Sequence, residues 1–210
     1  MSAAPAQDDA GALWLQTLQR AMDRASHDVN DALNGVSVNL EVIRSRALRP
    51  DVPASAIAAF SEAAAQQIER LSKLIEAVIA LSRSERTPAD VGLTLRRIVT
   101  LSAASSISGD ARVRLIDDGT AGSTLTRIRG DVVRLVLLAP LLEVVAGSDS
   151  AKCATDVECR LTGDDNAVQV GIVVADRKVT APEHVVEVAR AAGVRWTNGD
   201  KSLSLAFPRA

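Results

Sequence analysis

Two stretches of the chain repeat apolar residues every seven positions, which is the spacing of helices that pack lengthwise. In the first stretch, 10–48, the repeat consists of Leu15, Met22, Val29, Val36 and Ile43. In the second, 54–86, it consists of Ile57, Ala64, Leu71 and Val78. The pattern predicts two long amphipathic helices, and Asp8 and Asp9 are expected to provide the N-cap and first-turn acids of the first.

The segment Arg49-Pro50-Asp51-Val52-Pro53 separates the two helices. Each proline disfavours helical geometry in the preceding residue and cannot donate a backbone hydrogen bond, so the segment predicts a short loop and an antiparallel hairpin. The apolar faces of the two helices are too wide for the hairpin to bury alone, and a second copy would cover them most simply. We therefore expect a homodimeric four-helix bundle. In the alternative, the C-terminal part of the same chain covers the hairpin.

After Pro88 the pattern changes to shorter elements. Helical spacing predicts helices over 91–105, 131–146 and 182–192. Alternating apolar and polar residues predict strands over 111–116 and 125–128, within 153–163 and 166–176, and near 202–207. The sequence thus predicts an α+β fold with a flexible N-terminus over 1–9, a helical hairpin over 10–87 and an α/β sandwich over 88–210. In the sandwich, helices are expected to cover one face of a mixed sheet.

The composition of the 210 residues narrows the range of functions. A formal net charge of -2, with two Phe, two Trp and no Tyr, argues against nucleic acid as a partner. No apolar run reaches the ~20 residues of a membrane span, and the start of the chain lacks the basic and apolar regions of a secretory signal. We therefore expect a cytoplasmic protein that binds no membrane. Cys153 and Cys159 have no further ligands nearby and indicate neither a disulfide framework nor a zinc site.

His27 is one of two histidines, and it falls on the first predicted helix, two residues before Val29 of the apolar repeat. That register places it on the polar side of the helix, facing solvent. An exposed imidazole is largely uncharged at neutral pH and offers a nitrogen lone pair to an incoming electrophile. Asp28 follows directly and is expected to orient the ring, as carboxylates do at many histidine sites. The second histidine, His184, is expected to have no role beyond structure.

The segment His27-Asp28-Val29-Asn30-Asp31-Ala32-Leu33-Asn34 resembles the phosphoacceptor box of bacterial two-component sensor histidine kinases. Two later parts of the chain, IRGDVVRLVLLAPLLEVVAG and EHVVEVARAAGVRW followed by SLSLAFP, resemble segments of the ATP-binding domain of the same kinases. The resemblance covers nearly the whole chain. It implies a hairpin for dimerisation and phosphotransfer, followed by a kinase-like ATP-binding sandwich.

The chain departs from this family where the kinases bind nucleotide. Their nucleotide helix carries an asparagine that holds magnesium, but no asparagine occurs between Asp131 and Asp165. Their Asp-x-Gly-x-Gly motif is represented by Asp176-Arg177-Lys178-Val179-Thr180, in which side chains replace the glycines that allow a close approach to the nucleotide. Because phosphoryl transfer from ATP depends on positioning and on a metal ion, we expect a degenerate sandwich, no ATP use and no cofactor.

A kinase-like chain without these devices is similar to the histidine phosphotransferases of the ChpT type. The similarity implies a phosphorelay in which His27 takes a phosphoryl group from an aspartate of one response-regulator receiver domain and passes it to another. It also implies that the receiver supplies the magnesium, and a hybrid histidine kinase is a further candidate partner. Asn30, Asp31, Leu33 and Asn34 are expected to contact the receiver. Asp31 stands where many kinases have Thr or Asn for receiver dephosphorylation, so phosphatase activity by that route is not expected.

Two other functions remain open from the sequence. A non-catalytic dimeric adaptor would bind a receiver or a kinase, and its binding would survive His27→Ala. An ATP-using kinase would bind Mg-ATP tightly, which a nucleotide titration detects.

Overall fold

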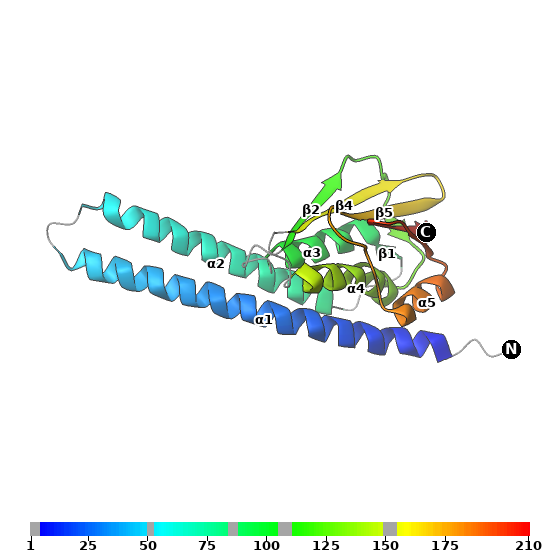
Figure 1. The fold of residues 1–210 in the computed structure, drawn as a ribbon, viewed down its shortest axis with the longest axis horizontal. Helices are drawn as coiled ribbons and strands as arrows, with labels where there is room; N and C mark the ends of the chain where they lie inside the picture. The colour runs from blue at the N-terminus through cyan, green and yellow to red at the C-terminus, as the bar shows by residue number, and fades with distance from the viewer. Residues whose placement is uncertain (1–4, 50–52, 84–87, 105–110, 149–154) are drawn as a thin grey trace.

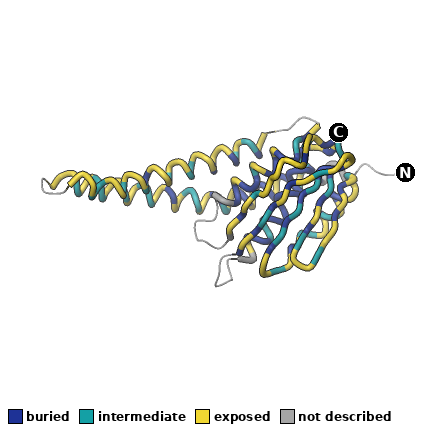
Figure 2. The backbone as a smooth tube through the Cα atoms, turned by 90° about the horizontal axis from the view of Figure 1, so that it is seen from above, coloured by how far each residue is buried: buried dark blue, intermediate teal, exposed yellow. Residues whose placement is uncertain are grey.

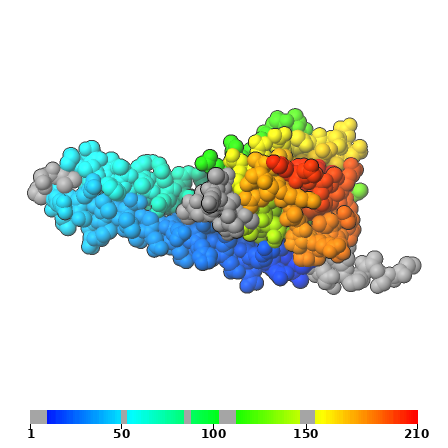
Figure 3. Space-filling view, viewed as in Figure 1, coloured from blue at the N-terminus to red at the C-terminus, as the bar shows by residue number. Residues whose placement is uncertain are grey.

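The computed structural model describes residues 5–49, 53–83, 88–104, 111–148 and 155–210. Its N-terminal part is a hairpin of two long helices, α1 (Pro5–Ala47) and α2 (Ser55–Ser82), and its C-terminal part is an α/β sandwich (Figure 1). One end of the hairpin packs against the sandwich, whereas the other end projects away from it (Figure 3). The prediction of an α+β fold that begins with a long helical hairpin is therefore confirmed.

The ends of the two helices differ from the predicted ends. Helix α1 begins at Pro5, because a proline suits the first position of a helix, where a backbone N–H has no partner. Asp8 and Asp9 lie inside the helix, so the prediction that one of them caps it is wrong. Of the predicted flexible N-terminus, residues 5–9 belong to this helix and residues 1–4 lie outside the described residues.

Helix α2 ends at Ser82 rather than near Arg86. Residues 84–87, where the sequence places the end of the helix, lie outside the described residues. The same holds for residues 50–52 of the predicted hairpin loop.

In the described residues, the sandwich contains helices α3 (Val91–Ala104), α4 (Gly130–Ser148) and α5 (Glu183–Ala191). Its strands are β1 (Ala89–Asp90), β2 (Ala111–Asp117), β3 (Leu125–Thr126), β4 (Thr155–Gly163), β5 (Ala167–Val174), β6 (Arg195–Asn198) and β7 (Ser202–Pro208). Each predicted helix and strand corresponds to one of these elements. Strands β1 and β6 are not predicted, because two and four residues are too few to show an alternating pattern.

Five strands form the main sheet, in the order β2-β4-β5-β7-β6. Strand β2 runs parallel to β4 and the other neighbours are antiparallel, so the sheet is mixed, as predicted. Along β4, Val157, Cys159 and Leu161 point into the core, whereas the residues between them are more exposed. Helices α3, α4 and α5 cover the buried face of the sheet (Figures 1 and 2).

Helix α4 lies at the centre of the molecule. It is apolar on every side, and its side chains Val133, Leu135, Leu137, Leu138 and Leu141 have no exposed surface. A helix of this composition must be covered all round. It packs against α1, α3 and α5, and one hydrophobic core runs from α1 through α4 to the sheet.

The base of the hairpin, residues 10–25 of α1 and 74–82 of α2, belongs to this core. The α1 residues that it buries are Ala10, Trp14, Leu18, Ala21 and Ala25. The alternative in which the chain's own C-terminal part covers the hairpin thus holds for the base. The outer part of the hairpin, residues 26–47 and 55–73, extends beyond the sandwich and is mostly exposed or partly exposed (Figure 2).

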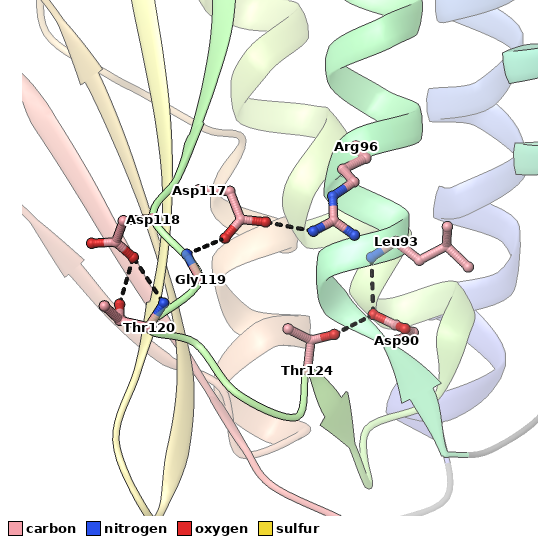
Figure 4. Close-up of polar contacts among 8 residues, drawn as sticks. All are labelled: Asp90, Leu93, Arg96, Asp117, Asp118, Gly119, Thr120 and Thr124. Carbon is pink, nitrogen blue, oxygen red and sulfur yellow. Dashed lines mark hydrogen bonds and ion pairs between the residues drawn. The ribbon is translucent and has the colours of Figure 1, made fainter.

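Figure 4 shows how the connection between β2 and β3 is held against α3. Asp90 precedes the helix, and its Oδ1 atom accepts hydrogen bonds from the Leu93 backbone N–H at 2.9 Å and from the Thr124 hydroxyl at 2.6 Å. The first bond satisfies one of the donors that the first turn of a helix leaves unpaired. Asp90 therefore caps α3 and ties it to the β2–β3 connection.

Asp117, at the end of β2, makes a second contact between this connection and α3. Its Oδ2 atom accepts a hydrogen bond from the Arg96 guanidinium at 2.5 Å, and its Oδ1 atom accepts one from the Gly119 backbone N–H at 3.1 Å (Figure 4). Both bonds favour the ionised carboxylate, so the pKa of Asp117 is lowered from its ordinary value, mainly by Arg96.

The lowered pKa of Asp117 predicts a pH-dependent contribution to stability. The ionised carboxylate stabilises the folded protein above the ordinary pKa of aspartate, and this contribution is lost as the pH falls through the lowered value. We expect Asp117→Asn to lower the midpoint of thermal unfolding at pH 7 by about 2 °C, the effect of a partly exposed ion pair. The difference from the unsubstituted protein should shrink toward pH 3. Calorimetry across this range, with the exposed Asp165→Asn as control, would contradict the assignment if the difference stayed constant.

Candidate functional site

His27 lies on α1 just beyond the base of the hairpin, and its side chain is exposed. Successive residues of an α-helix are turned by about 100°, so His27 lies about 140° from Met22 and about 160° from Val29. Met22 and Val29 belong to the apolar repeat. The imidazole therefore projects from the polar side of α1, where another molecule has access to it.

Asp28 occupies the adjacent face of α1 and is only partly exposed. Its Oδ2 atom is shielded from solvent. Neighbouring residues of a helix are about 100° apart and do not face each other. The carboxylate and the imidazole therefore start from different faces of the helix, and the orienting role of Asp28 stays a prediction.

The four predicted receiver contacts fall on two different faces of α1. Asn30, Asp31 and Asn34 are exposed. They follow His27 by three, four and seven residues, which places them within about 60° of it around the helix. Leu33, six residues after His27, lies about 120° away from it. Asn30, Asp31 and Asn34 thus surround the imidazole, whereas Leu33 belongs to another surface.

Val38 shares the face of His27 and is not among the residues predicted from the sequence. It follows His27 by eleven residues, which returns it to within about 20° of the same direction, about 16 Å farther along the helix. Its exposed fraction is 63%, so a large apolar side chain stands on an otherwise polar face. The feature of the sequence that could have identified Val38 is that this valine lies outside the seven-residue repeat.

A second surface of the hairpin is apolar, and we call it the apolar stripe. It consists of exposed side chains of α1 and α2, namely Leu15, Met22, Leu33, Leu40, Ile68, Ile75 and Ile79. Between the two helices the stripe contains a groove of about 430 Å³ lined by Met22, Ala25, Ser26, Val29, Asn30, Leu74, Ile75, Val78 and Ile79. Met22, in the groove, lies about 140° around α1 from His27, whereas Asn30 lines the groove and also lies within about 60° of His27.

The C-terminal half of α4, where the kinases carry their metal-binding asparagine, is filled with apolar side chains. Leu141, Val144 and Val145 are buried in the core. Glu143 forms an ion pair with Arg20 of α1, with 2.9 Å between Oε1 and Nη2. This part of α4 thus packs against the sandwich core and the base of the hairpin.

Asp176, the acid of the degenerate glycine motif, is bound by side chains of the same chain. Its Oδ2 atom accepts hydrogen bonds from the Thr155 hydroxyl at 3.1 Å and from the Arg177 guanidinium at 3.2 Å. Arg177 also donates to the Thr155 hydroxyl oxygen at 2.8 Å. The pKa of Asp176 is lowered, first by the hydrogen bond from Arg177. The carboxylate is therefore engaged by an arginine that the glycine-rich motif would not place there.

Other candidate chemistry is limited in the described residues. Cys159 is buried in β4, and burial raises its pKa to about 12, so the thiol is not a ready nucleophile. Among the described residues, no group of three or more His, Cys, Asp or Glu side chains is arranged to hold a metal ion. None of the helices described combines the length and apolar composition that crossing a bilayer requires.

Comparison with known proteins gives no match to a family model and no match among curated proteins. Solved structures of similar fold include the Acinetobacter baumannii histidine kinase AdeS, with 12% identity, a TM-score of 0.38, and coverage of 87% of this chain and 97% of that one. A bacterial phosphotransferase has 10% identity, a TM-score of 0.42, and coverage of 91% and 95%. The histidine kinase ThkA in complex with the response regulator TrrA has 12% identity, a TM-score of 0.41, and coverage of 93% and 63%.

These similarities concern the arrangement of the fold. The chain itself has a long N-terminal helical hairpin followed by an α/β sandwich. With identities of 10–12%, the function has to be argued from the residues of this chain.

The exposure of His27 predicts its reactivity toward diethyl pyrocarbonate, which acylates uncharged imidazole. Both histidines are exposed, so we expect His27 and His184 to be modified at comparable rates near neutral pH, as measured by mass spectrometry of peptides. His184 serves as the internal control. Strong protection of His27 alone would mean that its ring is covered in solution.

Proposed function

We propose that the chain is a histidine phosphotransferase of the ChpT type, acting in the cytoplasm as a homodimer without ATP. In this proposal His27 carries a phosphoryl group between the aspartates of response-regulator receiver domains. The observation that supports it most is an exposed histidine on the hairpin, together with side chains that occupy the positions where the kinases are expected to bind nucleotide. Leu141 and Val145 occupy the C-terminal half of α4, and Arg177 engages Asp176.

The proposed chemistry uses the uncharged imidazole as the nucleophile. A ring nitrogen attacks the phosphorus of the aspartyl phosphate in line, the N–P bond forms as the O–P bond breaks, and the receiver carboxylate leaves with the electron pair. The second receiver reverses these bond changes on its own aspartate. Magnesium bound by the receiver would neutralise charge on the phosphoryl oxygens. The chain itself contributes orientation, because α1 holds the imidazole at a fixed place on its polar face.

The receiver is proposed to dock along the polar face of α1. Asn30, Asp31 and Asn34 offer hydrogen bonds around His27, and Val38 offers an apolar contact about 16 Å farther along the helix. In this proposal Val38 adds to the predicted receiver contacts, and Leu33 stays a predicted contact on another face of α1.

A non-catalytic adaptor is the second candidate, because the exposed polar side of α1 offers a binding surface whether or not His27 reacts. An adaptor would use the same polar face and Val38 to bind a receiver but would form no phosphohistidine.

Phosphoryl transfer separates the two candidates directly. We expect a receiver carrying ³²P-labelled aspartyl phosphate to label the protein, with the acid-labile and base-stable behaviour of phosphohistidine. His27→Gln should reduce the label at least 100-fold, since no other residue near the site replaces the nucleophile. His184→Gln is the matched control and should label normally. A receiver that binds both proteins and labels neither would favour the adaptor.

The homodimer is proposed from the apolar stripe. Contiguous apolar surface of this length is rare on a monomer, and a second copy related by a twofold axis would bury the stripe against itself. The same packing would leave both copies of His27 on the outside of a four-helix bundle, because the imidazole lies about 140° from Met22.

Two charge substitutions test this arrangement by light scattering after gel filtration. We expect Ile75→Glu, in the groove, to shift the dimer to a monomer at micromolar concentration, because it buries a charge without a partner. Val38→Glu makes the same chemical change on the His27 face and should leave the dimer intact while weakening transfer from the receiver. If the dimer survives Ile75→Glu, or if it is lost with Val38→Glu, the interface does not lie on the apolar stripe.

A further inference from the structure

Arg134 is a buried arginine at the junction of the hairpin and the sandwich. It lies in the second turn of α4, and its exposed fraction is 4%. An arginine is always charged, and a charge removed from water has to be compensated by hydrogen bonds or by a partner. The contacts of Arg134 therefore show what the residue holds together.

The guanidinium bonds to backbone carbonyls of two different elements. Its Nη1 atom donates to the Leu81 carbonyl oxygen at 3.0 Å and also to the Arg83 carbonyl oxygen, and its Nε atom donates to the Gly130 carbonyl oxygen at 3.1 Å. Leu81 and Arg83 lie at the C-terminus of α2, where the last carbonyls of a helix have no partner within the helix. Arg134 therefore caps the end of α2 from the start of α4, and its positive charge matches the negative end of the helix dipole.

The same side chain also contacts α1. The guanidinium carbon of Arg134 lies 5.0 Å from the centre of the Trp14 ring, which is a cation–π distance. Trp14 is itself 5% exposed and belongs to the shared core. One side chain thus joins α1, α2 and α4 at a single point.

A separation of the sandwich from the hairpin would break all these contacts together. It would leave the charge of Arg134 and the carbonyl oxygens of α2 without their partners, and it would expose Trp14, Leu18 and Leu81. By contrast, the ion pair between Arg20 and Glu143 across the same junction is partly exposed, and such pairs contribute little. The buried contacts of Arg134 therefore add a specific polar link to the hydrophobic core that the two parts share.

We infer that Arg134 fastens the sandwich to the base of the hairpin, so that the two parts move as one rigid body and do not swing relative to each other. Helix α4 then stays alongside the base of α1. This inference does not depend on the chemistry proposed for His27.

The test measures the distance between the two parts in the full chain. Spin labels at Ser37→Cys on α1 and Thr162→Cys on β4, both exposed positions, are placed in a chain carrying Cys153→Ser and diluted with unlabelled protein. Double electron–electron resonance should give one narrow distance distribution for the chain with Arg134. Arg134→Met keeps an apolar stem but removes the donors, and we expect it to broaden the distribution or add a second population.

The control variant is Arg129→Met, on the residue just before α4, where the exposed Arg129 bonds to Asp131. It should give the narrow distribution of the parent chain. If Arg134→Met does not fold, Trp14→Leu removes the ring beneath the guanidinium, keeps the hydrogen bonds, and should broaden the distribution to a smaller extent. A broad distribution in the parent chain would overturn the inference. An unchanged narrow distribution in Trp14→Leu, and in Arg134→Met if that variant folds, would also overturn it.

Discussion

The arrangement of the molecule depends on covering α4. This helix has apolar side chains on all sides, so the sheet, α3, α5 and the base of the hairpin are all needed to keep it from water. Removing the hairpin base would expose the side of α4 that packs against α1, and removing the sandwich would expose Trp14, which contacts Arg134. Hairpin and sandwich are therefore parts of one folding unit, although the chain builds them one after the other.

The sequence predicts the elements well but not how they dock. The seven-residue repeat predicts α1 and α2, because helical periodicity is a local property that many residues report together. Within the base of the hairpin, Leu15 and Met22 of the repeat are exposed, whereas Trp14 and Leu18, which that repeat does not include, are buried. Which part of a helix is covered is decided by contacts between residues far apart in the sequence, such as Trp14 with Arg134, and no local pattern contains them.

The candidate site, too, could be predicted from the sequence only in part. The register of His27 against Met22 and Val29 predicts an exposed imidazole. The missing asparagine and glycines predict that the sandwich differs from the kinases where those bind nucleotide. Two details needed the structure. Asp28 is partly buried on the next face of the helix, which follows from the helical turn and from the packing of α1. Arg177 turns back onto Asp176 and Thr155, which depends on the side-chain conformation at the end of a strand.

The apolar stripe has a consequence for the life of the chain in a cell. Any molecule that covers Ile68, Ile75 and Ile79 binds the folded state and not the unfolded one, so it adds to stability by mass action. A newly made chain that has not met this occupant exposes the same surface to chaperones and to other unfolded proteins. The amount of protein that survives is then linked to how much of this occupant is present, so the apolar stripe would influence the abundance of the chain.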